Sequence, residues 1–341
     1  MLLKALSEAI GVSGREDVVR NLLRDQLQNH VDTLETDVIG NLYCYKNWSS
    51  KGPRILLAAH MDEVGLMVTK IEKDGFLRFR PVGSVDPRVL VSKPVVIGEA
   101  KVPGVIGAKP IHLQERDERK QALDYKDLFV DIGVSSDEEA KKLVSLGDLV
   151  AFTTKYQELP GGVLKGKAFD DRAGCAVLAK VLQKDYSVGV VGVFTVQEEV
   201  GFRGAQVVGQ TLQPDIAIVL EGTTAADVPE IEEHGQSTKM GAGPALTLMD
   251  GSVMPHRPTV EKLKSLADQL QIPIQYRRGS TGSTDAGVLQ RGSTGVKTAV
   301  LSIPCRYIHS PVSLLAKEDL VNAVQLVEAF IRAVEKEGVS A

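Results

Sequence analysis

Short, continuous apolar runs alternate with amphipathic stretches along most of the chain. Runs that are apolar at every residue are typical of strands buried on both faces of a sheet. Such runs predict strands at 54–59, 190–196, 216–220, 246–249 and 299–303. A helical period of apolar residues predicts helices at 2–10, 172–182, 260–270 and 318–334. Strands that alternate with helices favour a three-layer α/β fold, in which a mostly parallel central sheet lies between helices.

The turn after the first predicted helix carries a signal for the start of a second one. Residues 11–14 form a Gly-containing turn, and Ser13 precedes Glu16 by three residues. This spacing is typical of a capping box, in which the two side chains bond backbone N–H groups at the helix start. The helix itself is predicted by an apolar stripe made of Val18, Leu22, Leu23 and Leu27.

The pattern changes between residues 63 and 160. Short apolar runs alternate there with Gly, Pro and Asp, at 64–70, 76–82, 89–97 and 102–106. The dipeptide Asp74-Gly75 predicts a hairpin turn, residues 137–146 predict a helix, and the polar stretch 114–126 predicts an exposed or mobile loop. We therefore predict two domains. Residues 1–62 and 161–341 form the α/β domain, and residues 63–160 form an inserted β-rich domain, a barrel or a PDZ-like fold.

Composition narrows the class of protein. The chain has 341 residues, of which 43% are hydrophobic and 25% charged, which is ordinary for a soluble globular protein. The net charge of -4 argues against nucleic acid or an anionic membrane as a partner. No apolar stretch approaches the roughly 20 residues of a membrane span, and the first ten residues do not resemble a signal peptide.

The three cysteines indicate a reducing compartment. Cys44, Cys175 and Cys305 lie far apart, and no pair has metal-ligand spacing such as C-x-x-C. A secreted disulfide scaffold is therefore not expected. We expect buried thiols and a cytoplasmic protein.

Acidic and histidine residues follow four of the predicted strands. In chain order these residues are His60, Asp62, Glu198, Glu199, Glu221 and His309. Because ligands of an open α/β sheet bind beyond the carboxyl ends of its strands, we expect these side chains to meet in one crevice. Asp170 and Asp171 add a further acidic pair, in a loop that enters the helix at 172–182.

Imidazole and carboxylate together suit Zn²⁺, Co²⁺ or Mn²⁺. Two such ions held close together need an anionic bridge and can activate one shared water. One Asp can bridge, while each ion takes a His and another carboxylate. A Glu that binds no metal can then take a proton from the water, and the adjacent Glu198 and Glu199 allow that division of roles. Each element also has an alternative without a metal. A lone His after a strand is often a structural or surface residue, Asp170-Asp171 alone could cap a helix, and paired glutamates are usually solvated.

Four phrases resemble the motifs of one known family. They are AAHMDEVG at 58–65, KAFDDRAG at 167–174, TVQEEVG at 195–201 and RYIHSP at 306–311. In this order they resemble the glutamyl-aminopeptidase or tetrahedral (TET) aminopeptidase family of dinuclear metallopeptidases, which includes proteins labelled cellulase M. The resemblance covers essentially the whole chain.

The resemblance implies a metal site of five residues. His60 would bind one metal and Asp170 would bridge both. Glu199 and His309 would complete the second metal. Glu221 lies where the family places the remaining carboxylate of the first metal.

The resemblance also implies two further roles. Glu198 would be the general base, and Asp62 would orient His60. Glu221 departs partly from the family pattern, which commonly has Asp at that position, so its denticity and the metal preference stay open. Asp227 is the alternative ligand nearest in the sequence.

The implied activity is that of a metal-dependent aminopeptidase, which hydrolyses N-terminal residues from peptides through a water activated by two metals. The implied cofactors are two divalent ions per subunit, Zn²⁺ or Co²⁺, with Mn²⁺ as an alternative. The resemblance further implies self-association through the inserted domain, as a dimer and a tetrahedral dodecamer. A lid or a dimer-only module is the competing role for that domain.

Other functions remain open at this stage. A deacylase of N-blocked amino acids or peptides shares the same metal chemistry. A glycoside hydrolase normally uses two carboxylates flanking a sugar, without a dinuclear metal. A non-catalytic binding protein would be expected to lack a ligand or the Glu198 base, and none is missing.

Two other groups of residues bear on the site. Residues 282–287 resemble a family segment near the metals, so Thr284 and Asp285 are expected to support the site by hydrogen bonds, although a plain turn is the alternative. The basic residues that could pair with an acidic substrate side chain are Lys239, Arg257 and Arg306, with a surface or structural role as the alternative for each. Glutamyl, leucyl and lysyl preferences all stay open.

Overall fold

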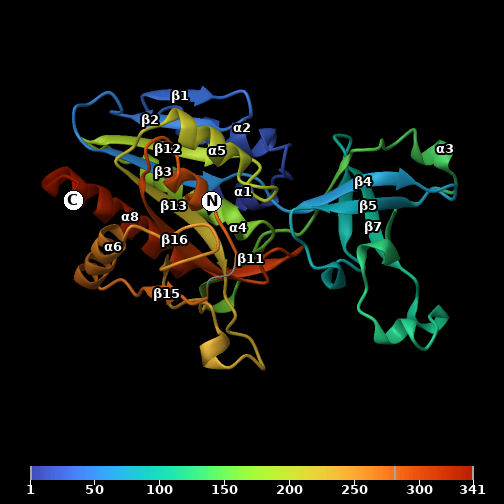
Figure 1. Cartoon of the computed structure of the whole chain (residues 1–341). Helices are drawn as coiled ribbons and strands as arrows, with labels where there is room; N and C mark the ends of the chain where they lie inside the picture. The colour runs from blue at the N-terminus through green and yellow to red at the C-terminus, as the bar shows by residue number, and fades with distance from the viewer. Residues whose placement is uncertain (1, 280–281, 340–341) are drawn as a thin grey trace.

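One sheet of eleven strands runs through the larger part of the molecule, which a computed structural model describes for residues 2–279 and 282–339. Nine strands follow the order β1-β2-β12-β3-β13-β16-β17-β11-β10, and β14 and β15 are attached beside β16 (Figure 1). Their bounds are Thr33–Thr36 (β1), Leu42–Lys46 (β2), Arg54–His60 (β3), Gln157–Leu159 (β10), Val163–Gly166 (β11), Gly189–Thr195 (β12), Ile216–Thr224 (β13), Ala245–Thr247 (β14), Gln275–Arg277 (β15), Lys297–Arg306 (β16) and Ser313–Ala316 (β17). The neighbours β12, β3, β13 and β16 are parallel, which confirms the mostly parallel centre of the predicted sheet.

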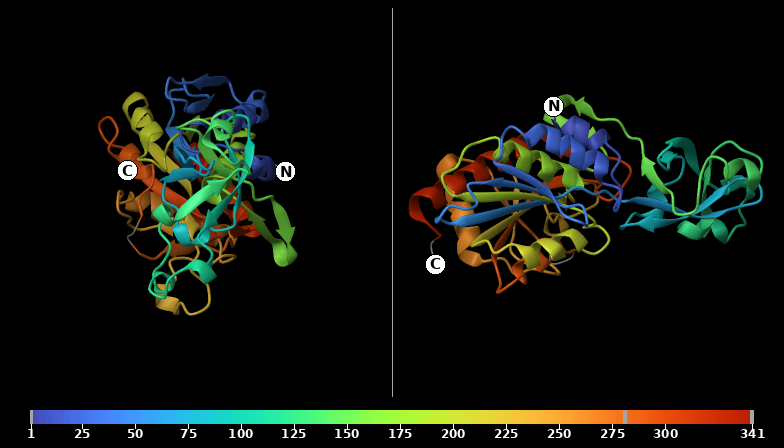
Figure 2. Two further views of the ribbon diagram at one scale, coloured as in Figure 1. Left: turned by 90° about the vertical axis from the view of Figure 1, so that its right-hand side faces the viewer. Right: turned by 90° about the horizontal axis from the view of Figure 1, so that it is seen from above.

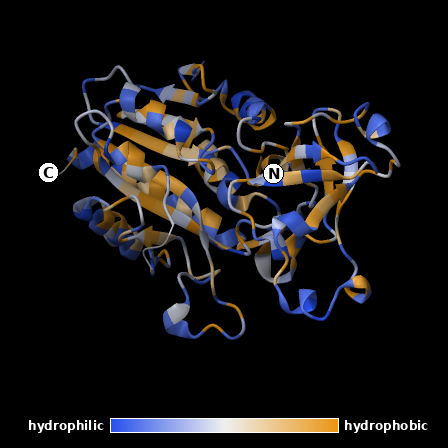
Figure 3. Cartoon of the chain, turned by 45° about the vertical axis from the view of Figure 1, so that its right-hand side comes forward, coloured by the Kyte–Doolittle hydropathy of each residue, from blue (hydrophilic) through white to orange (hydrophobic). Residues whose placement is uncertain are grey.

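Helices cover both faces of this sheet. They are α1 (Leu2–Glu8), α2 (Asp17–Leu27), α4 (Phe169–Leu182), α5 (Arg203–Thr211), α6 (Arg257–Leu270), α7 (Ala286–Gln290) and α8 (Lys317–Glu337). Alternate residues of β3 enter different cores: Ile55 and Leu57 pack with α4 and α8, whereas Leu56 and Ala58 pack with α5 and α7. The view from above shows the sheet between its helix layers (Figure 2), and hydrophobic colour is concentrated on the strands (Figure 3). The predicted three-layer fold is confirmed.

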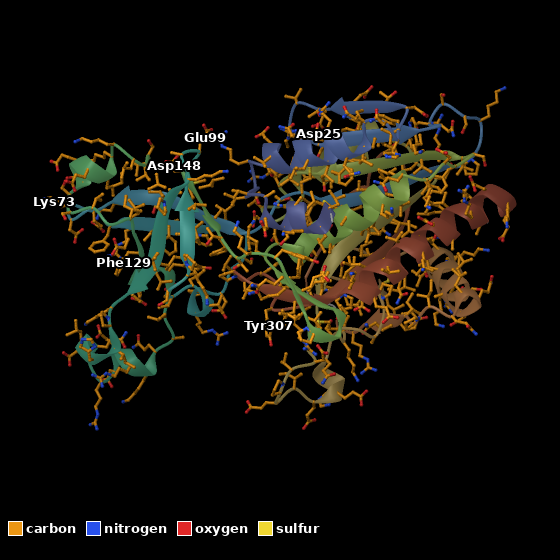
Figure 4. The ribbon with its side chains drawn as sticks, turned by 180° about the vertical axis from the view of Figure 1, so that it is seen from behind. Asp25, Lys73, Glu99, Phe129, Asp148 and Tyr307 are labelled. Atoms are coloured by element: carbon orange, nitrogen blue, oxygen red, sulfur yellow. The ribbon has the colours of Figure 1, made fainter. Side chains whose placement is uncertain are left out.

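A second sheet closes into a six-stranded barrel in the order β4-β5-β8-β7-β6-β9. The strand bounds are Gly65–Ile71 (β4), Leu77–Val82 (β5), Pro94–Ile97 (β6), Val102–Ala108 (β7), Leu128–Asp131 (β8) and Leu149–Phe152 (β9). The barrel has its own apolar core, which includes Leu66, Leu77 and Ile106. It projects from the α/β body (Figures 1 and 2), and from behind Phe129 and Asp148 mark the barrel while Asp25 marks the body (Figure 4). The predicted β-rich insertion is therefore a barrel.

Short elements connect the barrel strands and the body. They are α3 (Asp137–Ala140) and the 3-10 helices η1 (Pro87–Val89), η2 (Ile111–Leu113), η3 (Glu118–Lys120), η4 (Tyr125–Asp127), η5 (Pro160–Gly162) and η6 (Glu233–Gly235). The predicted hairpin at Asp74-Gly75 is confirmed, because β4 and β5 pair antiparallel around it and Gly75 has φ +88. The helix predicted at 137–146 is shorter than expected. Leu143 and Leu146 are 46% and 65% exposed, so further helical turns would bury little apolar surface.

The predicted capping box is wrong. The helix α2 begins at Asp17, and no side chain caps its first turn. Ser13 donates its hydroxyl to Asp62 Oδ2 at 2.6 Å instead. Glu16 accepts from the backbone N–H groups of Gly14 and Gln197. Both side chains that the local pattern assigned to the helix start thus bond to distant parts of the chain, at Asp62 and Gln197.

Hydrophobicity along the helices bears on membrane insertion. In residues 2–279 and 282–339, every helix is too short or too polar to cross a bilayer.

Candidate metal centre

Parallel strands deliver the predicted site residues to one edge of the sheet. His60 is the last residue of β3, and Glu198 and Glu199 come shortly after the end of β12 at Thr195. Glu221 lies within β13, which continues three residues past it to Thr224. His309 follows the end of β16 by three residues. Because these four strands run in the same direction, their carboxyl ends meet at one crevice.

His60 lies at the bottom of this crevice and is 1% exposed. Its Nε2 atom is 3.1 Å from Glu221 Oε1 and 3.4 Å from Asp170 Oδ1. Its Nδ1 atom is 3.4 Å from Asp62 Oδ1. Asp62 is fixed in turn by the backbone N–H groups of Glu198 and Glu199, which donate to its two oxygens at 3.0 and 3.1 Å. The imidazole thus has a carboxylate on each side.

Asp170 lies between the two histidines. Its Oδ1 atom faces His60 at 3.4 Å, and its Oδ2 atom faces His309 Nε2 at 3.1 Å. His309 Nε2 is also 3.6 Å from Glu199 Oε1. One carboxylate therefore separates a His60 and Glu221 group from a His309 and Glu199 group, which is the arrangement that two cations sharing a bridge require.

By distance alone, Asp171 is as good a candidate metal ligand as its neighbour Asp170. Ligand atoms of His60, Asp171 and Glu221 lie within 4.8 Å of one another, as do those of His60, Asp170 and Glu199. However, Asp171 Oδ2 accepts from the backbone N–H of His60, and its Oδ1 accepts from Gly174 N at 2.9 Å. Both oxygens of Asp171 are thus occupied by the backbone, including the start of α4. This favours Asp170 as the carboxylate aimed into the crevice.

Burial raises the pKa values of the three glutamates in the centre. It raises the pKa of Glu199 to about 7, the pKa of Glu221 to about 8, and the pKa of Glu198 well above its usual value. Burial also acts to lower the pKa of His60, but Glu221 and Asp170 outweigh it and keep that pKa well above its usual value. Several carboxyl groups therefore lie close together in a region of low polarity, where bound cations would stabilise their charged forms.

Three buried polar atoms of the centre have no hydrogen-bond partner among the described residues. They are His60 Nδ1, Asp170 Oδ1 and Glu199 Oε1. Buried polar atoms are normally bonded, so such orphans call for an explanation. All three atoms belong to side chains grouped as potential ligands. Imidazole with carboxylate is a donor set that divalent transition metals accept. The residues present therefore fit a metal centre.

A cleft of about 310 Å³ opens above these residues. Glu198, which is 8% exposed, lines it together with Asp170, Glu199 and Glu221. Ser84 reaches the same cleft from the loop after β5, so the barrel supplies part of the wall. No local pattern in the sequence pointed to Ser84, because the contact joins two distant parts of the chain.

Asp285, Thr284 and Asp227 were also predicted from the sequence to lie at or near the site. Asp285 Oδ2 accepts from the Thr195 hydroxyl at 2.6 Å, and Thr284 lines the cleft. Burial raises the pKa of Asp285 to about 6. Asp227 does not join the clustered ligands, since it binds Arg306 at 2.9 and 2.6 Å.

The three basic residues considered for substrate binding are engaged elsewhere. Arg306 pairs with Asp227, the exposed Arg257 pairs with Glu261, and Lys239 pairs with Glu233. None of them lines the cleft as the described residues form it. These ion pairs and their absence from the lining of the cleft favour the surface or structural role for the three residues, and a role in substrate binding stays a prediction.

Sequence comparison identifies a family model and a related enzyme. The family model described as M42 glutamyl aminopeptidase matches residues 40–326. The lysyl aminopeptidase of Pyrococcus furiosus is 32% identical over 347 residues, which cover 97% of this chain and 96% of that enzyme.

Solved structures give the same result at the level of the fold. A TET aminopeptidase from the marine sediment archaeon Thaumarchaeota archaeon SCGC AB-539-E09 superposes with a TM-score of 0.95 at 39% identity, covering 99% of this chain and 97% of that one. A Pyrococcus horikoshii TET1 peptidase, described as able to assemble into a tetrahedron or a large octahedral shell, has a TM-score of 0.86 at 34% identity over 97% and 98%. A Thermotoga maritima protein described as an endoglucanase has a TM-score of 0.80 at 39% identity over 97% and 99%.

Proposed function

The chain belongs to the M42 glutamyl aminopeptidase family and is a peptidase, and from that premise we propose that it removes N-terminal residues from peptides at a centre of two metal ions. The family resemblance of the four motifs is thereby confirmed, including the proteins labelled as glucanases. The observation that supports the proposed site best is Asp170, whose two oxygens face His60 and His309 at 3.4 and 3.1 Å.

The proposed ligands divide into two groups around that bridge. His60 and Glu221 would hold one ion, and Glu199 and His309 would hold the other. Zn²⁺ and Co²⁺ suit these ligands, and Mn²⁺ is an alternative. Asp62 is proposed to orient His60, because its carboxylate lies 3.4 Å from Nδ1 and is itself fixed by three hydrogen bonds.

Glu198 is proposed to move the proton. Bound divalent ions would polarise the scissile carbonyl and make a water acidic near pH 7. Glu198 lines the cleft beside the ligands, and its raised pKa suits a group that accepts a proton near neutral pH. It takes the proton from the attacking water and passes it to the amine that leaves. The backbone N–H of Glu198 is held by Asp62, so the base is positioned by the same carboxylate that faces His60.

Exopeptidase action is proposed because the related lysyl aminopeptidase is named as an aminopeptidase, and because this chain belongs to the M42 glutamyl aminopeptidase family. An aminopeptidase acts on a free N-terminal amino group, whereas a deacylase acts on a blocked one. Cleavage of free and N-acetylated substrates therefore separates the two activities.

A metal-depletion assay tests the proposal. Protein treated with a chelator is assayed on amino-acid p-nitroanilides, on the N-acetylated forms and on β-glucan, before and after Zn²⁺, Co²⁺ or Mn²⁺ is restored. We expect anilide hydrolysis to disappear with the chelator and to return with metal, while the other two substrates stay intact. Equal activity with and without metal would refute the proposed centre, and preferential cleavage of acetylated substrates would favour the deacylase.

We also propose that the division of the chain into 1–62 with 161–341 and the inserted 63–160 separates catalysis from self-association. In the inserted domain, Val105, Ile111 and Leu113 are 47%, 69% and 60% exposed, and Val105 and Ile111 line one hollow. A patch of exposed apolar side chains is a candidate contact surface. A dimer that builds a tetrahedral dodecamer is the proposed assembly. Sedimentation with and without metal would reveal it, and a monomer under both conditions would contradict it.

The cellular location stays a prediction. Cys44, Cys175 and Cys305 are all free and buried, which supports the reducing cytoplasm as the proposed compartment.

A further inference from the structure

His309 is the least buried of the five proposed metal ligands. Its side chain is 38% exposed, whereas the side chains of the other four are at most 11% exposed. His60 and Glu221 belong to strands of the central sheet, but His309 lies in the irregular segment 307–312 between β16 and β17. In the described chain, no turn or loop hydrogen bond between backbone groups involves this segment. The ligand therefore depends on other contacts for its position.

The backbone of this segment adopts a conformation that its residues disfavour. Tyr307 and His309 have φ values of +60 and +55, in the left-handed region that residues with a Cβ atom rarely occupy. Such conformations persist where the surrounding structure determines them. Within the segment, the Ser310 hydroxyl lies 2.7 Å from the Tyr307 carbonyl oxygen, and at its end the Thr154 hydroxyl donates to the Pro311 carbonyl at 2.7 Å.

An ion pair anchors the beginning of the segment. Arg306 is the last residue of β16, and its Nε and Nη2 atoms donate to the two carboxylate oxygens of Asp227 at 2.9 and 2.6 Å. The two side chains are 28% and 16% exposed. Exposed ion pairs contribute little to stability, but a paired fork of this kind fixes the orientation of the guanidinium as well as its position. The pair thus holds the chain three residues before His309.

Asp227 belongs to the chain that leaves another proposed ligand. It lies three residues beyond β13, the strand that holds Glu221 and pairs with β16 along its length. Where this pairing ends, the backbone N–H of Ala225 donates to the Cys305 carbonyl at 2.9 Å. The ion pair lies beyond this last bond and ties the chain that leads to His309 to the chain that leaves Glu221.

We propose that the Arg306–Asp227 pair positions His309 and thereby sets the affinity of the second metal ion, the one assigned to Glu199 and His309. The inference rests on the proposed two-metal function. Neither residue of the pair lines the cleft as the described residues form it, so the pair acts through the backbone and touches neither metal nor substrate. The other ion uses His60 at the end of β3, whose position does not depend on the segment.

Counting bound metal tests this role without an activity assay. Full-length protein is equilibrated with buffers of defined free Zn²⁺ concentration, and the bound ions are counted by elemental analysis. Groups that orient metal ligands typically contribute a factor of about 10–100 in metal affinity. Arg306→Met should therefore raise the free Zn²⁺ concentration that half-fills the second site about tenfold or more, while the first site changes by less than about threefold.

Further variants assign the effect to the pair. Arg306→Lys keeps the charge but not the fork and should recover part of the loss. Asp227→Asn should resemble Arg306→Met, and the double variant should bind the second ion no more weakly than either single variant, because both changes remove one interaction. Arg278→Met is the matched control. Arg278 donates to the Glu233 carbonyl, in the loop that follows Asp227, so its loss removes a positive charge from that loop and should leave both sites unchanged.

The metal counts separate the inference from the function on which it rests. If the unchanged protein binds fewer than two ions, the proposed centre fails and the inference fails with it. If the protein binds two ions and Arg306→Met binds both as tightly, the centre stands and the positioning role is overturned. Equal weakening of both sites, without recovery in Arg306→Lys, would indicate a structural role and overturn it as well.

Substrate kinetics distinguish positioning of the ligand from contact with the substrate. At a Zn²⁺ concentration that fills both sites, Arg306→Met should regain most of its kcat, and KM should stay the same for Glu, Leu and Lys p-nitroanilides. A rise in KM for the Glu substrate alone, with both ions bound as tightly as in the unchanged protein, would assign Arg306 to the substrate and overturn the inference.

Discussion

Lys167 should be among the most sensitive positions for stability outside the proposed metal ligands. Its Nζ donates to both oxygens of Glu63 at 2.6 Å and to the Ala9 carbonyl at 2.9 Å. Both charged side chains are 2% exposed. Glu63 begins the segment that enters the barrel, and Lys167 lies between β11 and α4 of the α/β domain. The ion pair thus joins the chain segment that enters the barrel to the start of α4 and, through Ala9, to the N-terminal region.

The magnitude follows from what a Lys167→Met substitution leaves behind. Glu63 would keep the backbone N–H of Gly11 at 3.0 Å and Arg172 Nη2 at 3.4 Å, but would lose its two shortest hydrogen bonds. Burial lowers the pKa of Lys167 to about 8, so the ammonium is still mostly charged at pH 7. Breaking a buried pair by removing one partner costs about 3–5 kcal/mol, and we expect a loss of unfolding free energy in that range.

Urea unfolding at pH 7, followed by circular dichroism at saturating metal, measures this loss. Lys155→Met is the control, because Lys155 is 73% exposed and its nitrogen lies 3.6 Å from Glu8, so its midpoint should not move. The double variant Glu63→Gln with Lys167→Met should be more stable than Lys167→Met alone, since it buries no unpaired charge. The reasoning is refuted if Lys167→Met costs no more than Lys155→Met.

Three further predictions concern the base, the metal count and pH. Glu198→Gln should lower kcat by a factor of about 10²–10⁴, while elemental analysis finds the same amount of bound metal as in the unchanged protein. If the variant loses its metal, Glu198 is a ligand and not the general base. His309→Ala should reduce the bound metal from two ions per subunit to one, and two retained ions would argue against it as a ligand. Glu16 is 4% exposed, and burial raises its pKa from 4.5 to about 7. The folded state therefore favours the protonated acid, so the stabilisation by Glu16→Gln should be absent below pH 4.5 and reach at most about 3 kcal/mol above pH 7; an equal gain at pH 5 and 8 would contradict this.

Residues whose position depends on local pattern were predictable. The apolar run at 54–59 becomes β3 because both of its faces are buried, and His60 follows directly at its end. The same holds for Glu221 on β13, although the strand continues past it. Parallel pairing of these strands then brings their ends together, which the α/β rhythm of the sequence already favours.

Residues whose role depends on distant contacts were not predictable in the same way. Ser13 and Glu16 have capping-box spacing, but Asp62 and the backbone of Gln197 engage them instead. Arg306 looked available for substrate until its pairing with Asp227 was visible. The presence of Arg277 in the lining of the cleft gave no signal either, because only the pairing of β14 with β15 brings it there.

The position of bound metal tests the central claim most directly. Crystals grown with Zn²⁺ and measured on both sides of its absorption edge locate the ions by anomalous scattering. The account predicts two peaks, on opposite sides of the Asp170 carboxylate, one in contact with His60 and Glu221 and the other with Glu199 and His309. A single peak, or peaks away from Asp170, would contradict it.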